Sequence, residues 1–159
     1  MASKTSILSV MGVALAAVVL YGVVRSCLEN DETRIRKVVY QAAFAVERKD
    51  LLKCASLVSD AYDDRYGNNK PALIQFVGRI FQEFEGFRVE IKTLKTDIKA
   101  EQASASIGYK AYFKKRTQDQ LYYDAGILEV NFQKEEGRWR ARRIEYKGMN
   151  ELLFIQSVA

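Results

Sequence analysis

The side chains that could take part in chemistry are carboxylates, tyrosines, arginines and two cysteines, because none of the 159 residues is a histidine. Histidine is the commonest general acid/base and the commonest metal ligand in proteins. Its absence excludes Ser-His-Asp and Cys-His nucleophilic catalysis. Cys27 and Cys54 make neither a zinc site nor a disulfide framework. We therefore expect no metal ion and no cofactor.

Arginines cluster near the C-terminus. Arg138, Arg140 and Arg142 would share one face of a strand, because side chains alternate along a strand. That basic face could meet anionic lipid headgroups, an acidic partner or nucleic acid. The interpretation as an ordinary solvated sheet face also stands, because four nearby acids could pair across the strands: Glu129, Glu135, Glu136 and Glu145. No aromatic platform for stacking bases is recognisable, so we expect no specific nucleic-acid partner.

The N-terminal stretch from Ile7 to Val24 contains 18 residues and no charge. As a helix it would be roughly 27 Å long, close to the hydrocarbon thickness of a bilayer. We expect an uncleaved single-pass anchor over residues 1–28 and a soluble domain over residues 29–159, outside the cytoplasm. A cleaved signal peptide, a lipoprotein signal ending at Cys27 and a buried core helix remain alternatives.

Three helices are predicted after this stretch. Asp31-Glu32-Thr33 can cap the first, which continues with apolar residues at helical spacing to about Lys49. Asp50 can cap a second, which we expect to end at Gly67. Asn69-Lys70-Pro71 starts a third, which we expect Gly86 to close.

From Phe87 onward the period changes from 3.6 to 2, which predicts strands. The alternation slips near Thr93, which indicates a bulge, and it is regular from Ala103 to Phe113. Two further strands are predicted on either side of a hairpin turn at Glu135-Glu136-Gly137. Three helices followed by about four antiparallel strands predict an α+β fold, with the helices covering one face of a curved sheet.

This order of elements resembles the nuclear transport factor 2-like superfamily, also called cystatin-like. The stretches that support the resemblance are LVSDAYDDRYG, KPALIQFVGRIFQEF and NFQKEEGRWRARRIEY, and it covers about residues 31–147. It implies a cone-shaped domain with an apolar pocket. The superfamily includes ketosteroid isomerases, dehydratases, polyketide cyclases, transport factors and secretion-system assembly subunits, so the resemblance implies a fold rather than one function.

The resemblance to the ketosteroid isomerase members implies candidate catalytic residues. Tyr40 corresponds to their helix-one tyrosine, and Asp64 corresponds to their base, with Arg65 in place of the usual proline. Their late-strand acid falls on Leu128, and the nearest acid, Asp124, is four residues earlier. One of the three positions is missing. The resemblance also implies an apolar pocket, for which the candidate lining residues are Tyr40, Tyr62, Phe76, Tyr109, Tyr123 and Trp139.

Two hypotheses about function follow. The first is a membrane-anchored, non-catalytic interaction or scaffold module, similar in architecture to the inner-membrane assembly factors of type IV secretion. A protein partner or a homodimer would use the sheet or the apolar C-terminal stretch GMNELLFIQSVA. The alternative is a membrane-tethered pocket protein that binds a small apolar ligand or acts as a cyclase or isomerase.

Overall fold

The computed structural model describes residues 30–147. The expected anchor Ile7–Val24, Cys27 and residues 148–159 lie outside the described residues. Between residues 30 and 147, no helix has the length and hydropathy needed to cross a bilayer. The described residues from Ile35 onward belong to one compact unit, which contains the whole sheet.

Helix α2 runs from Asp31 to Glu47. Asn30, one residue earlier than expected, accepts hydrogen bonds at its start, from the backbone N–H groups of Thr33 and Arg34 to its carbonyl oxygen. Ile35 and Val39 are buried, as the helical spacing predicts. Lys49 follows the helix with a φ of 55° and so turns the chain toward α3.

Helix α3, Leu51–Ser56, is much shorter than the predicted second helix, which was expected to reach Gly67. Asp50 caps it as expected, and its carboxylate accepts the Lys53 N–H at 2.9 Å. After α3 the backbone pairs with the last strand instead of continuing as a helix. The Ser59 N–H donates to the Ala141 carbonyl at 2.9 Å, and the Ala141 N–H donates to the Leu57 carbonyl at 2.9 Å.

Helix α4, Lys70–Glu83, begins as predicted. The Asn69 side chain accepts the Ala72 N–H at 3.1 Å, and proline occupies the first turn, where no backbone donor is needed. The expectation that Gly86 closes this helix is wrong, because the strand already starts at Phe84. Gly86 instead lies in the strand with a φ of 65°, at a register shift between Glu85 and Arg88.

Four antiparallel strands form one sheet in the order β1-β2-β3-β4: β1 Phe84–Lys99, β2 Gln102–Lys115, β3 Leu121–Glu135 and β4 Arg138–Lys147. A register shift between Ile91 and Thr93 confirms the predicted bulge. The predicted hairpin turn is confirmed between β3 and β4. Glu136 and Gly137 both have positive φ there, as a tight two-residue turn requires.

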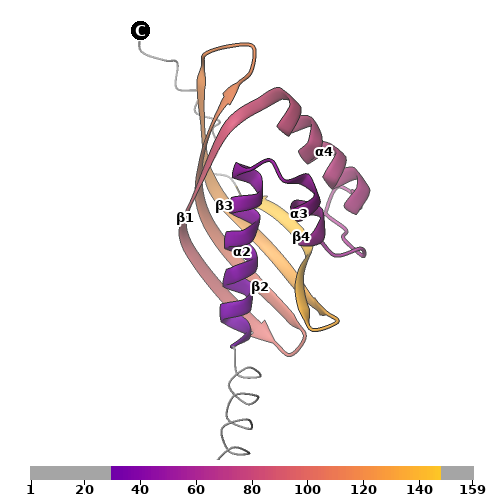
Figure 1. Cartoon of the computed structure of the whole chain (residues 1–159). Coiled ribbons are helices and arrows are strands. Elements are labelled where there is room, and N and C mark those ends of the chain that lie inside the picture. Colours follow the sequence, from indigo (N-terminus) through magenta and orange to yellow (C-terminus); the bar gives the residue numbers. More distant parts are fainter. Residues whose placement is uncertain (1–29, 148–159) are drawn as a thin grey trace, which may run out of the picture. The chain divides into compact units, whose positions relative to one another are not determined.

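The helices lie on one side of the curved sheet, so the fold has a helical layer and a sheet layer (Figure 1). The core lies between them, where the inward residues of the strands meet α2. Its buried residues are Ile35, Val39, Ala103, Ala105, Ile107, Val130, Phe132, Trp139 and Ala141. In the described part of the chain, three helices on a four-stranded antiparallel sheet confirm the predicted α+β fold.

Candidate functional site

An apolar cavity of about 370 Å³ lies between the helices and the inner face of the sheet. All three helices and all four strands contribute to its wall. Protein interiors are normally close-packed, with few voids larger than a water molecule, so a space of this size is a distinct feature. The helical side is lined by Val38, Val39, Ala42, Ala43, Val46, Cys54, Leu57, Val58, Leu73, Ile74 and Val77. The sheet side is lined by Val89, Ile91, Ile107, Tyr109, Ala111, Leu128, Val130, Phe132, Ala141 and Ile144.

Small side chains leave this space open. Ala42 and Ala43 face the cavity from α2, and Ala111 faces it from β2, where a larger residue would extend into it. Cys54 and Tyr109 are the lining residues with a polar group on the side chain. Burial, and to a lesser degree the charge of Asp50, raises the pKa of the Cys54 thiol, so it stays protonated near neutral pH. The wall is therefore chemically inert over most of its area.

Tyr109 connects the cavity wall to a cluster of polar groups. Its ring lines the cavity, and its hydroxyl donates to Asp124 Oδ2 at 2.6 Å. The Tyr146 hydroxyl lies 3.4 Å from Asp124 Oδ1. Tyr109, Asp124 and Tyr146, which we call the Asp124 cluster, come from β2, β3 and β4. Their strand parity places them on the inner face of the sheet, beside the cavity.

A glycine makes this cluster possible. Gly126 is opposite Tyr109 in the β2–β3 register, and the Tyr146 ring lies across it. A Cβ atom on Gly126 would lie 2.8 Å from Cε2 of that ring, closer than carbon atoms can approach. Glycine at 126 therefore lets Tyr146 reach across β3 to Asp124.

Both phenols of the Asp124 cluster hold their protons strongly. Burial raises the pKa of Tyr109 far above its ordinary value, and the hydrogen bond to Asp124 and the charge of that carboxylate add to the effect. Burial also raises the pKa of Tyr146, with the Asp124 charge as the second cause. At neutral pH both hydroxyls are protonated and oriented toward the carboxylate.

The structure brings together two of the residues singled out from the sequence, Tyr109 and Asp124. Tyr40, on α2, is 49% exposed and does not line the cavity. Asp64 lies in the loop before α4, where its carboxylate accepts hydrogen bonds from the backbone N–H groups of Tyr66 (2.8 Å) and Asn68 (2.9 Å). The Asn68 side chain, the largest cause, and these backbone groups lower the pKa of Asp64. Its position is that of a loop-forming residue.

The other aromatic candidates lie outside the cavity wall. Phe76 is 53% exposed on α4, and Tyr62 and Trp139 are buried elsewhere in the interior. Tyr123 projects from the outer face of the sheet and packs against Tyr112, with ring centroids 5.2 Å apart. Tyr146 was not predicted as a site residue, because the sequence distinguishes it only by the strand parity that it shares with Ile144.

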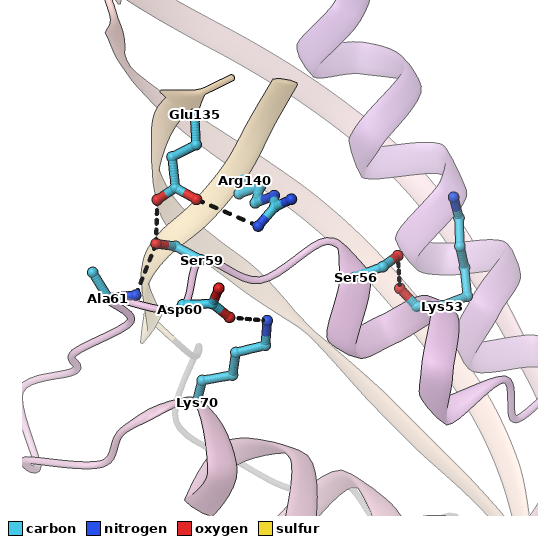
Figure 2. Close-up of polar contacts among 8 residues, drawn as sticks. All are labelled: Lys53, Ser56, Ser59, Asp60, Ala61, Lys70, Glu135 and Arg140. Atoms are coloured by element: carbon cyan, nitrogen blue, oxygen red, sulfur yellow. Dashed lines mark hydrogen bonds and ion pairs between the residues drawn. The ribbon is translucent and has the colours of Figure 1, made fainter. Parts of the chain in front are cut away.

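A second polar group of residues joins the loop after α3 to the β3–β4 hairpin. The Ser59 side chain, which is fully buried, donates to Glu135, and Glu135 lies 3.6 Å from Arg140 (Figure 2). We call these three residues the Ser59 cluster. Beside it, Lys70 pairs with Asp60 at 2.7 Å. Nε of Arg140 is buried and has no hydrogen-bond partner.

The predicted basic face is divided between different environments. Arg140 belongs to the Ser59 cluster, and Arg138 is exposed opposite Glu135 at the hairpin. A register shift in β4 places Arg143, not Arg142, opposite Asn131. Arg143 donates to the Asp63 carbonyl at 2.9 Å. Among residues 30–147, no group of three or more cysteine or acidic side chains is arranged to hold a metal ion.

Comparison with known proteins identifies the fold. No protein-family profile and no curated protein matches the sequence. Solved structures do match, with a TM-score of 0.70 for a candidate scytalone dehydratase from Novosphingobium aromaticivorans, at 14% identity over 75% of this chain and 84% of that one. A nuclear transport factor 2-like protein from Salmonella enterica serovar Typhimurium gives 0.67, at 12% identity over 79% and 96%.

A hexachlorocyclohexane dehydrochlorinase, LinA type 2, gives a TM-score of 0.65 at 10% identity, over 81% of this chain and 93% of that one. At such low identities the likeness shows the fold alone. The described part of the chain has the nuclear transport factor 2-like, or cystatin-like, fold.

Proposed function

We propose that this protein binds a small, predominantly apolar molecule in the cavity between its helices and its sheet. The observation that supports this most directly is the wall, which is apolar apart from the Cys54 thiol and the Tyr109 ring with its hydroxyl. An apolar void of about 150 Å³ stays dry and binds benzene. At about 370 Å³ this cavity is larger, and at about 30 Å³ for each water-sized group it has room for roughly ten non-hydrogen atoms.

The composition of this wall favours ligand binding over catalysis. Its lining residues include no carboxylate and no amine, and the chain has no histidine. General acid/base catalysis needs a group of that kind at the reacting atoms, and Asp124, the carboxylate that Tyr109 connects to the wall, already accepts the Tyr109 hydroxyl at 2.6 Å. Two proteins with a similar fold are named for action on scytalone and hexachlorocyclohexane, which supports the use of this fold for small organic molecules.

The test is binding of naphthalene, a neutral fluorescent hydrocarbon of ten carbons, to the full chain in detergent, measured against a protein-free detergent blank. Ala42→Phe places a ring in the cavity, whereas Gln41→Phe adds the same ring to an exposed position on the same helix. We expect Ala42→Phe to weaken probe binding at least about tenfold, because the ring occupies the space, and Gln41→Phe to leave it unchanged.

The melting temperature separates loss of the cavity from loss of the fold. Filling a void adds apolar contacts, so Ala42→Phe should melt no lower than the unsubstituted chain. Equal probe binding by the unsubstituted chain and Ala42→Phe would overturn the proposal.

We also propose that Ile7–Val24 anchors the chain in a membrane and that residues 29–159 lie outside the cytoplasm. The support is the sequence itself, 18 consecutive uncharged residues. The chain should stay with vesicles after carbonate washing, and external protease should reach the domain in spheroplasts. A chain that carbonate releases would contradict the anchor. Blue-native electrophoresis of the solubilised protein would test for the expected protein partner or homodimer.

A further inference from the structure

We infer that the ligand is an amphiphile whose apolar body occupies the cavity and whose polar end donates a hydrogen bond to Asp124. The inference rests on the proposed function for the apolar body and adds the chemistry of the polar end. Tyr109 is the physical link, because its ring is part of the cavity wall while its hydroxyl contacts the Asp124 carboxylate. A molecule that lies along that ring and extends past it reaches the carboxylate.

Asp124 has spare capacity to accept hydrogen bonds. An ionised carboxylate has about four lone-pair positions. Within residues 30–147 its side-chain hydrogen bonds are those from Tyr109, at 2.6 Å, and Tyr146, at 3.4 Å. Phenols stabilise the carboxylate without neutralising it, and no lysine or arginine in the described part of the chain forms an ion pair with it. The cluster therefore offers a negative charge and an unfilled acceptor beside an apolar space.

Among residues 30–147, the cluster is partly exposed. The β3–β4 pairing in this part of the chain runs from Ile127 to Glu135, and Asp124 lies outside it. Asp124 and Tyr109 are half-buried, and Tyr146 is 50% exposed. A polar end group can remain partly hydrated here while the apolar body is covered, which is the arrangement an amphiphile needs.

The negative charge of the Asp124 carboxylate determines the class of ligand. A hydroxyl or a protonated amine donates to a carboxylate, and hydrogen bonds to charged groups are the stronger ones. A carboxylate end group has no proton to donate and is repelled. The ligand is therefore an alcohol or an amine with an apolar body of roughly ten carbons rather than a fatty acid.

Three compounds with the same decyl chain test this inference: decanol, protonated decylamine and decanoate, each displacing naphthalene from the full chain. We expect decanol and decylamine each to bind at least about tenfold more tightly than decanoate. In Asp124→Asn the tenfold advantage of decylamine over decanoate should fall below about threefold. Asp119→Asn removes an exposed carboxylate from the β2–β3 loop and should keep the full preference.

Tyr146→Phe is the second variant, because it keeps the ring over Gly126 and removes one hydrogen bond to Asp124. It should keep or increase the preference for decylamine, since the carboxylate then has one donor fewer. Decanoate binding as tightly as decanol, or a preference that survives Asp124→Asn, would overturn the inference about the polar end alone. Failure of the fluorescent probe and all three decyl compounds to bind would overturn the proposed function and this inference together.

Discussion

The cavity and the Ser59 cluster both join the helical side of the fold to the sheet, but with opposite chemistry. Around the cavity, apolar side chains from α2, α3 and α4 face apolar side chains of the strands and leave space between them. At the Ser59 cluster, a hydrogen bond from Ser59 to Glu135 joins the loop after α3 to the β3–β4 hairpin, and Glu135 also pairs with Arg140 within that hairpin (Figure 2).

This difference indicates which part of the interior can accommodate a ligand. Polar groups that are buried and bonded to one another fix the positions of their partners, because each lost bond leaves an unsatisfied group. Apolar contacts have no direction, so a hydrocarbon ligand can replace empty space without leaving any group unsatisfied. The Ser59 cluster fixes the loop after α3 on the β3–β4 hairpin, whereas the cavity can accommodate a ligand.

The largest expected difference in the free energy of unfolding is between two separate alanine-to-leucine variants, one in the packed core and one at the cavity. Ala105, 1% exposed in the packed core, has no room for more atoms, so Ala105→Leu should lower the free energy of unfolding by about 1–3 kcal/mol. Ala42 faces the cavity, so Ala42→Leu should raise the free energy of unfolding by up to about 1 kcal/mol. Urea denaturation measures both, and changes of the same sign would mean that the cavity is not open in solution.

A smaller difference in the free energy of unfolding is expected between alanine substitutions at two serines that are three residues apart. Ser59→Ala removes the donor to Glu135 from a fully buried site and should cost about 1–2 kcal/mol. Ser56 donates to the Lys53 carbonyl at 2.7 Å on the exposed side of α3, so Ser56→Ala should change stability by less than about 0.5 kcal/mol. Equal decreases in the free energy of unfolding in the two variants would show that the Ser59 cluster does not stabilise the junction between the loop after α3 and the β3–β4 hairpin.

The smallest effect concerns alkaline pH and the Asp124 cluster. Because the folded-state pKa of Tyr109 lies above that of the unfolded chain, its contribution is fully present below about pH 10 and is lost as the pH rises further. Urea denaturation between about pH 8 and pH 11 should therefore show a shallower loss of stability in Tyr109→Phe than in the unsubstituted chain. Tyr66→Phe, at a largely exposed phenol, is the matched control.

Most of the fold could be predicted from the sequence because the strands are long and their alternation is regular. The bulge near Thr93 and the turn at Glu136-Gly137 both follow from breaks in that pattern. The second helix was predicted too long because Val58 and Tyr62 continue the helical spacing after Cys54. Their burial has another cause, since the chain beyond Leu57 pairs with Ala141, far away in sequence.

The site was less predictable than the fold. Tyr109 could be found because it lies on the inward parity of β2, which also passes through Ile107. Tyr40 and Phe76 were predicted from the resemblance and the pocket that it implies. Both are about half exposed, because on a helix one position corresponds to a rotation of about 100°. The pairing of Asp124 with Tyr109 depends on strand register, which a single sequence does not specify.

The pairing between the loop after α3 and β4 also has a consequence for the order of folding. Arg143 and Asp63, which are hydrogen-bonded across this junction, are separated by 80 residues of chain. Contacts between distant segments form only after the entropy of closing a long loop has been lost, so they tend to form slowly. The meander of neighbouring strands can assemble from local hairpins, and the segment from Leu57 to Asp63 then closes onto its edge as a late step.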